Sequence, residues 1–568
     1  MSPGPLEQAI AERLALWERE RVAERLWAKD GSLWAASGKP AEEVASWLGW
    51  LDLPDGMAAQ ADEIARLARE IREDGYTRAA VLGMGGSSLA PELFSRAFGG
   101  PSGEPAESGL ELRILDSTHP DAVRGFRGWA QSARTLFCVS SKSGSTTEPN
   151  AFHAAMADFA PALDFVAITD PGSSLAELAR AQEFRAIVDG RPDVGGRYSA
   201  LSAFGLLPAA LHGVDLERLL GSAAEMAAAC RRPATDNPGL RLGAWMGEAA
   251  LAGRDKLTIL ASPRLASFGD WAEQLVAEST GKAGTGIVPV VGEPLRDARD
   301  YADDRCFVLL TTAQELPAEQ QRLAGALEAA GHPVLRLEIE DAHALGGEFV
   351  RWEIATAAAG VVLGIDPFDQ PNVQESKDAT RELLEAFRRD GSLPAPAPMV
   401  AEPGVAAFGD PRAIGDAPVT VDGAVRALLE SAQAGDYVAI LAYLPQDPDT
   451  EDRLQAVRGH IGTELGVATT LGFGPRFLHS TGQLHKGGPD SGVFLQVTAD
   501  PRRDLPIPGW EETFGTLVAA QALGDLQSLQ QRNRRVLRLH FGEPDGVLDR
   551  LADLVDRAVP ASAASARS

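Results

Sequence analysis

The stretch TLFCVSSKSGSTTEPN, residues 135–150, joins a short apolar run to a loop that is rich in serine and threonine. The apolar part reads as a buried strand, and a helix-like segment follows the loop. In open parallel sheets, ligands bind beyond the carboxyl ends of the strands, and anions bind at helix N-termini. The stretch therefore predicts one strand of a parallel sheet with an anion-binding loop at its end.

The same alternation of strand, turn and helix continues along the chain. Further strand-like runs stand at AAVLG (79–83), ELRILD (111–116), DFVAITD (164–170), KLTILAS (256–262), CFVLLTT (306–312), PVLRLEIE (333–340) and DYVAILAYLP (436–445). Strands that alternate with helices are typical of an α/β protein whose parallel sheet has helices on both faces. We therefore expect an α/β fold with two doubly wound parallel-sheet domains.

The pattern also predicts the domain boundaries. A helical N-terminal segment covers 1–58, and a first sheet domain with the anion-binding loops covers 59–245. A second sheet domain covers 250–545, with an irregular insertion at 389–425 where proline, alanine and glycine accumulate. A C-terminal helix and tail cover 546–568, and the tail PASAASARS is expected to be disordered.

Composition excludes several classes of protein. The 568 residues carry a net charge of −27, which argues against nucleic acid as a partner, because its phosphates require a basic face. No run approaches the ~20 apolar residues of a membrane-spanning helix, and the acidic N-terminus does not resemble a signal peptide. The three cysteines are widely spaced and have no zinc-site spacing. We therefore expect a cytoplasmic protein without a bound metal.

A second glycine- and serine-rich loop, LGMGGSSLAPELF (82–94), follows the first predicted strand. A dinucleotide fingerprint would need glycine at position 88, where the chain has Ser88, so NAD binding is disfavoured. One such loop could be a simple tight turn or helix cap. Two of them, after two strands of one sheet, favour a phosphate site.

A further motif, AESTGKAGTGIVPV (277–290), places Glu278 just before a turn that partly resembles a nucleotide P-loop. A P-loop would need glycine at 276 and a hydroxyl at 283, where the chain has Val276 and Ala283. The P-loop interpretation fails, and the carboxylate needs another explanation.

Taken together, these motifs resemble those of the phosphoglucose isomerase family. The two loops resemble the sugar isomerase (SIS) domain, which holds sugar phosphates. The segments VGGRYSALSAFG (194–205), FDQPNVQESK (368–377), AESTGK (277–282) and LHSTGQ (478–483) resemble the family's two signatures, its base segment and its histidine motif. The order of the last motifs is most like the isomerase half of the fused transaldolase–phosphoglucose isomerases. No transaldolase half is recognisable, so we expect a single activity.

The resemblance implies roles for particular residues. Glu278 is the general base that moves a proton between C2 and C1 of an enediolate, and Arg197 stabilises the developing oxyanion. Lys377 lies beside the ring oxygen, and His479 opens the sugar ring, with His485 as an alternative. The substrate- and phosphate-binding residues implied by the motifs are Gly86, Ser87, Ser141, Lys142, Ser143, Thr146 and Gln370.

The implied activity is the interconversion of glucose 6-phosphate and fructose 6-phosphate, without a cofactor or metal. In this family the histidine comes from the neighbouring subunit, so the resemblance also implies a homodimer. Two alternatives stay open. One is an isomerase for another sugar phosphate, such as mannose 6-phosphate or an amino sugar phosphate. The other is a non-catalytic sugar-phosphate sensor, although a sensor would not need Glu278, Arg197 and Lys377.

Overall fold

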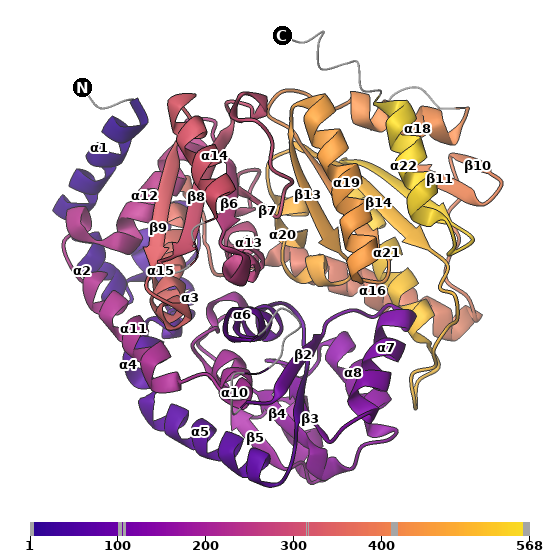
Figure 1. Cartoon of the computed structure of the whole chain (residues 1–568), viewed down its shortest axis with the longest axis horizontal. Helices are drawn as coiled ribbons and strands as arrows, with labels where there is room; N and C mark the ends of the chain where they lie inside the picture. Colours follow the sequence, from indigo (N-terminus) through magenta and orange to yellow (C-terminus); the bar gives the residue numbers. More distant parts are fainter. Residues whose placement is uncertain are drawn as a thin grey trace.

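The structure is a computed structural model that describes residues 5–99, 105, 109–313, 315, 317–410 and 419–559. The named strands form three sheets. Helices α6 (Leu89–Phe98) and α13 (Ala266–Thr280) lie in the centre of the molecule, where the three sheet regions meet (Figure 1). The tail at 560–568 falls outside the described residues.

The first sheet has five parallel strands in the order β2-β1-β3-β4-β5. They are β1 Arg78–Leu82, β2 Glu111–Leu115, β3 Thr135–Ser140, β4 Phe165–Thr169 and β5 Ala186–Asp189. The α/β fold with a parallel sheet, predicted from the sequence, is confirmed. Strands β1 and β3 are neighbours, with Arg78 opposite Thr135, so the loops that follow them leave the same edge of the sheet.

The second sheet has four parallel strands in the order β7-β6-β8-β9. They are β6 Lys256–Ala261, β7 Val288–Val291, β8 Arg305–Thr312 and β9 Val334–Ile339. The strand expected at 436–445 is present as β12, but it belongs to another sheet. The sequence pattern did not reveal this division of the stretch 250–545 between two sheets.

The third sheet has six strands in the order β10-β11-β15-β14-β12-β13. They are β10 Val400–Glu402, β11 Val405–Gly409, β12 Tyr437–Tyr443, β13 Ala468–Phe473, β14 Gly492–Ala499 and β15 Arg535–Phe541. Strands β12 to β15 pair in parallel, whereas β10 and β11 form an antiparallel hairpin at the edge. The segment 389–425, expected to be irregular, therefore contains this hairpin, and its residues 411–418 lie outside the described ones.

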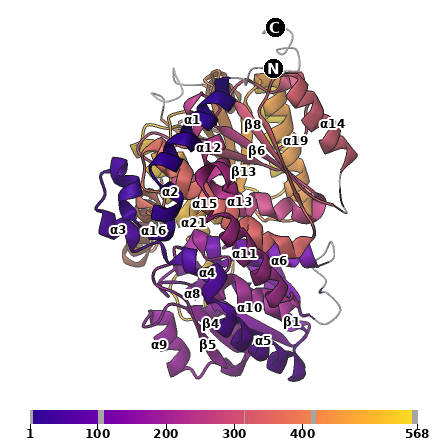
Figure 2. The same ribbon diagram turned by 90° about the vertical axis from the view of Figure 1, so that its left-hand side faces the viewer.

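Helices cover and connect these sheets. Their bounds are α1 Pro5–Arg19, α2 Val22–Trp27, α3 Ala41–Ala45, α4 Leu53–Gly56, α5 Ala58–Glu73, α7 Pro120–Gln131, α8 Thr147–Ala157, α9 Ser174–Ala181, α10 Ala203–His212, α11 Leu216–Ala229, α12 Pro238–Leu251, α14 Ala318–Ala329, α15 Leu345–Leu363, α16 Pro371–Asp390, α18 Val421–Glu430, α19 Pro448–Leu465, α20 Gly482–Gly487, α21 Phe514–Gln531 and α22 Val547–Ala558. The helical N-terminal segment predicted from the sequence is confirmed, and its helices run along one side of the molecule (Figure 2). Within the described ranges, no helix combines the length and apolar character needed to cross a membrane.

The third sheet and its helices, residues 400–410 and 419–559, are called the C-terminal unit below. Its helix α21 buries Phe514 and Leu517 in one apolar cluster with Leu82 and Val139 of the first sheet. A second cluster joins other apolar residues of the unit to Ala277 of α13. Two buried apolar contacts therefore hold the C-terminal unit against both other sheet regions, and burial of such surface is the main stabilising contribution to a fold.

Candidate active site

The carboxylate of Glu278 lies in the last turn of α13 and is buried, with 6% of the residue exposed. Gln274, one turn earlier on the same helix, donates a hydrogen bond from Nε2 to Glu278 Oε2 at 3.0 Å. Glu278 Oε1 lies 3.5 Å from Arg197 Nη1. The base implied by the sequence is thus fixed in one orientation beside a buried positive charge.

The guanidinium of Arg197 is held by four further hydrogen bonds. Its Nε donates to Ser279 Oγ at 2.7 Å, and its Nη1 donates to Gln370 Oε1 at 2.8 Å. Its Nη2 donates to the carbonyl oxygens of Pro367 and Asp369 at 2.6 and 3.0 Å. A cation fixed in this way can stabilise a negative charge without reorganising first. The bonds also bring the FDQ segment, with Gln370, to Glu278.

The loop after β1, which the sequence predicts to bind phosphate, contacts the Arg197 loop backbone to backbone. The loop after β1 forms the short helix η3 (Gly85–Ser87), and Arg197 lies in η5 (Gly196–Tyr198). A Cβ atom built on Gly86 would stand 1.9 Å from the carbonyl oxygen of Gly196. Only glycine at position 86 permits this approach, and it places the neighbouring Ser87 beside the Arg197 loop.

The second loop lies at the same edge of the sheet, where β3 leads into α8. Thr146 is the N-cap of α8, and its side chain makes no hydrogen bond to the helix backbone. Ser141 Oγ donates to Thr146 Oγ1 at 3.3 Å, and Ser143 lies exposed at the loop tip. Hydroxyl groups around a helix N-terminus form a suitable cradle for a phosphate.

Lys142, predicted to bind the phosphate, has its ammonium group directed elsewhere. Its Nζ donates hydrogen bonds to the Asp170 carboxylate and, at 2.8 Å, to the carbonyl oxygen of Arg191. In this conformation Lys142 holds the loop to the segments that follow β4 and β5, and a contact with phosphate would require these bonds to break.

His479 reaches the site from the C-terminal unit of the same chain, on η10 (Arg476–His479). Its Nε2 lies 3.1 Å from Glu148 Oε1, and its carbonyl oxygen accepts from Gln274 Nε2 at 2.8 Å. Burial would raise the pKa of Glu148, but the charge and hydrogen bond of His479 outweigh it and lower that pKa. The two form a carboxylate–imidazole pair of the kind that orients a histidine for proton transfer.

His485, the alternative candidate, lies away from these groups. His485 is 2% exposed, and its ring packs against Phe477, Tyr437 and Phe494. Burial holds the pKa of His485 well below its usual value, and nearby cations lower it further. Of the two histidines, His479 is the one that the fold places beside Gln274 and Glu148.

Lys377 lies on the exposed side of α16, and its charge contributes to the lowered pKa of Glu148. Lys282, which the sequence reasoning quoted without giving it a role, is buried instead. Its Nζ donates at 2.6 Å to the carbonyl oxygen of Asp366 and at 2.7 Å to Asp369 Oδ1. Burial and the charge of Arg197 lower the pKa of Lys282 to about 8. Lys282 therefore holds the segment around Asp369 against the C-terminal end of α13.

Gln274 and Glu148 were also missed by sequence reasoning. Glu148 belongs to the quoted loop, but nothing in the spacing shows that a histidine more than three hundred residues later will meet it. Gln274 precedes Glu278 by four positions, the separation at which helical side chains are neighbours. That signal was available in the sequence.

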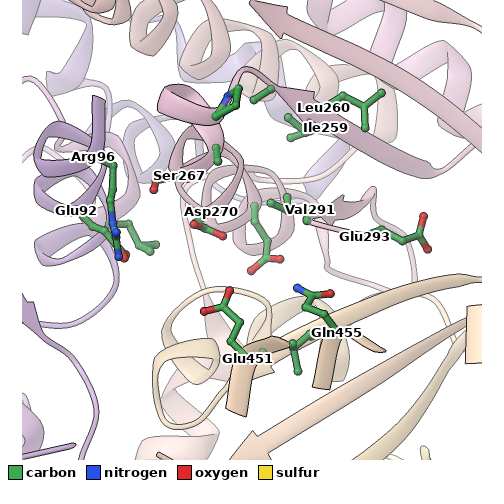
Figure 3. A pocket seen from close by; sticks show the side chains of 18 of the residues that line it. Glu92, Arg96, Ile259, Leu260, Ser267, Asp270, Val291, Glu293, Glu451 and Gln455 are labelled. Carbon is green, nitrogen blue, oxygen red and sulfur yellow. The ribbon is translucent and has the colours of Figure 1, made fainter. Parts of the chain in front are cut away.

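A cavity of about 900 Å³ opens on another side of α13. Asp270 of α13 and Glu451 of α19 extend into it from different sheet regions (Figure 3). Burial raises the pKa of Asp270 to about 7 and that of Glu273 to about 8. In the described part of the chain, no group of three or more metal-ligating side chains is placed to hold a metal ion.

Comparison with solved structures identifies the fold. A hypothetical protein of Thermus thermophilus superposes with a TM-score of 0.55 at 24% identity, covering 67% of this chain and 98% of its own. A glucose-6-phosphate isomerase from Chlamydia trachomatis gives a TM-score of 0.53 at 18% identity, covering 67% and 86%. The fold is that of the SIS-type sugar-phosphate isomerases.

Comparison of sequences is more specific, although no family model matches the chain. A glucose-6-phosphate isomerase of Synechococcus is 30% identical over 378 residues, covering 56% of this chain and 70% of the relative. One of Rubrobacter xylanophilus is 29% identical over 363 residues, covering 55% and 84%. The chain belongs to the glucose-6-phosphate isomerase family.

Proposed function

We propose that this protein interconverts D-glucose 6-phosphate and D-fructose 6-phosphate. The observation that carries the proposal is the fixed pair of Glu278 and Arg197, 3.5 Å apart, at the edge of the sheet where the two phosphate loops leave it. The family membership supports the same assignment.

The chemistry follows from the positions of these groups. In the open-chain aldose, Glu278 removes the proton from C2, and the electrons pass into an enediolate. Arg197 stabilises the negative charge that develops on the enediolate oxygen. A proton passes from O2 to O1, the C2–O2 double bond forms, and Glu278 returns the carbon-bound proton to C1, which gives the ketose. One proton moves between adjacent carbons, so a single positioned carboxylate serves both half-reactions.

Ring opening needs a second acid–base group, because hexose phosphates are mainly closed hemiacetals. We assign this step to His479, which exchanges a proton with the ring oxygen while Glu148 holds the imidazole in place. Lys377 lies close enough to influence Glu148 electrostatically. The phosphate is assigned to the loops with Ser87 and Ser141.

The remaining members of the proposed phosphate site are Gly86, Ser143 and Thr146. Gln370, held by Arg197, is assigned to a contact with the sugar. Lys142 is assigned to the phosphate-binding loop on sequence resemblance, and its bond to Asp170 favours a structural role there.

We further propose that one chain carries a complete site. The contacts of His479 with Gln274 and Glu148 lie within the chain, and buried apolar clusters hold the C-terminal unit in place. The implied supply of this histidine by a neighbouring subunit is therefore not needed to assemble the site. A homodimer, implied by the family resemblance, stays a prediction that sedimentation of the purified protein tests.

We also propose a cytoplasmic location. The relatives are named glucose-6-phosphate isomerases, and the sugar phosphates of that reaction belong to central carbohydrate metabolism. Cell fractionation with an antibody against the chain tests it.

The test of function is turnover of fructose 6-phosphate to glucose 6-phosphate in buffer with EDTA. Wild type should be active, and Glu278→Gln should lose about 10²–10⁴-fold in kcat because its base is gone. Glu273→Gln is the matched control, since it makes the same change on the same helix but faces the cavity. It should keep wild-type turnover.

Each other result has a meaning. If the wild-type protein binds the sugar phosphate without turnover, the proposal of an enzyme is wrong and a non-catalytic sensor is favoured. If it turns over mannose 6-phosphate but not glucose 6-phosphate, the proposed substrate is wrong. Equal activity in Glu278→Gln and wild type would remove Glu278 from its role.

A further inference from the structure

The Glu148 carboxylate has a second partner besides His479. Gln521, in the middle of α21 of the C-terminal unit, donates from Nε2 to Glu148 Oε1 at 2.7 Å. Thr118, in the loop after β2, donates from Oγ1 to Gln521 Oε1 at 2.6 Å. All three residues are buried: Thr118 is 0% exposed, Gln521 2% and Glu148 6%.

The direction of these bonds follows from the groups themselves. An ionised carboxylate only accepts hydrogen bonds, so the Gln521 amide must present its NH₂ group to Glu148. Its oxygen then faces Thr118, and a hydroxyl can donate to it. The chain of Thr118, Gln521 and Glu148 therefore has one consistent orientation, which ends at the His479 ring.

We propose that Gln521 is a positioning residue, which fixes the Glu148 carboxylate and through it the proton-transfer state of His479. The inference rests on the proposed function, because it concerns the ring-opening step of that reaction. It assigns to the C-terminal unit a second part in the site, in addition to His479 itself.

The hydrogen bond from Gln521 stabilises the ionised form of the buried Glu148 carboxylate. A buried carboxylate tends to take up a proton unless donors and positive charges favour its ionised form. Around Glu148 these are Gln521 from α21, His479 from η10 and Lys377 from α16. The Glu148 charge also contributes to the raised pKa of Tyr443 on β12, where burial is the main cause.

Removing the Gln521 amide takes one hydrogen bond from the ionised Glu148 carboxylate, so the pKa of Glu148 should rise. In Gln521→Leu, the acid-side fall of kcat/KM should move to higher pH by about one unit. Thr118→Val, which keeps the amide but frees its oxygen, should shift the fall in the same direction by less. Gln527→Leu makes the same change at a half-buried position of the same helix, away from the bonds that His479 and Gln521 make to Glu148, and it should leave the profile unchanged.

A second measurement does not need activity. The carboxyl carbon of Glu148, identified in the NMR spectrum by its loss in Glu148→Gln, should titrate at higher pH in Gln521→Leu than in wild type, because the ionised form has lost a hydrogen-bond donor. Melting temperatures of all variants show whether they fold, and Thr118→Val provides the test if Gln521→Leu does not.

The outcomes separate this inference from the proposed function. Unchanged pH profiles and an unchanged Glu148 titration in both Gln521→Leu and Thr118→Val would overturn the role of Gln521 in an active enzyme. A shifted titration in a protein that never isomerises sugar phosphates would instead refute the function and leave the positioning role in place.

Discussion

The contact between Gly86 and Gly196 gives a prediction that can be worked out from distances. In Gly86→Ala, the new methyl group would stand 1.9 Å from the Gly196 carbonyl oxygen, where real Cβ atoms keep at least 3.0 Å. Backbone lies on both sides of this contact, so no flexible side chain can give way. The two loops must separate by about 1 Å.

That separation moves the phosphate loop relative to Arg197. A displacement of ~1 Å in a group that positions a substrate can cost about 10²-fold in rate. Overpacking of a buried site also costs about 1–3 kcal/mol of folding free energy. We therefore expect Gly86→Ala to lose about 10²-fold in kcat/KM for fructose 6-phosphate and to melt at a lower temperature.

The matched control is Gly196→Ala, on the opposite side of the same contact. A Cβ there would meet no atom within 4 Å, so this variant should keep most of its activity and stability. Coupled-enzyme kinetics and thermal melts on both variants make the test. Wild-type kinetics in Gly86→Ala, or equal damage in the two variants, would refute the reasoning.

Three further predictions follow from the site and the cavity. His479→Asn should lose about 10²-fold or more in turnover of the closed sugar, while His485→Phe should stay active because position 485 lies in an aromatic cluster. The reverse result would assign ring opening to His485. A mixture of inactive Glu278→Gln and His479→Asn, unfolded and refolded together, should stay inactive, whereas sites shared across a dimer would recover about a quarter of wild-type activity. Burial raises the pKa of Glu273 to about 8, so between about pH 4.5 and 8 the folded state binds more protons than the unfolded state and loses stability as pH rises. The melting temperature of Glu273→Gln should therefore exceed that of wild type by an amount that grows from pH 5 to pH 8. A difference that stays constant with pH would contradict the shift.

Much of the first sheet could be predicted because its signals are local. Each predicted strand is a short apolar run, and each loop carries its own glycines and hydroxyls, as in the stretch 135–150. Roles for Glu278 and Arg197 were implied by the resemblance of their short motifs to those of a known family, and they stay predictions. These predictions required no knowledge of which segments meet in space.

The division of the second half into two sheets could not be predicted in this way. Strands β8 and β12 have similar apolar patterns, and only long-range pairing decides which sheet each joins. The same limit applies to Glu148 and Gln521, which are ordinary helix residues until the C-terminal unit docks. Distances between segments, rather than residue types, define that part of the site.

The place of the C-terminal unit in the chain has a consequence for biosynthesis. The ribosome makes the segments with Glu278 and Arg197 well before β14 and β15, so the early part of the chain emerges while the docking surfaces around Leu82 and Ala277 are uncovered. Nascent chains with such uncovered apolar surface are prone to aggregation. Catalytic activity should thus appear late in synthesis. The same docking of the C-terminal unit should cover the apolar surface to which a chaperone would otherwise bind.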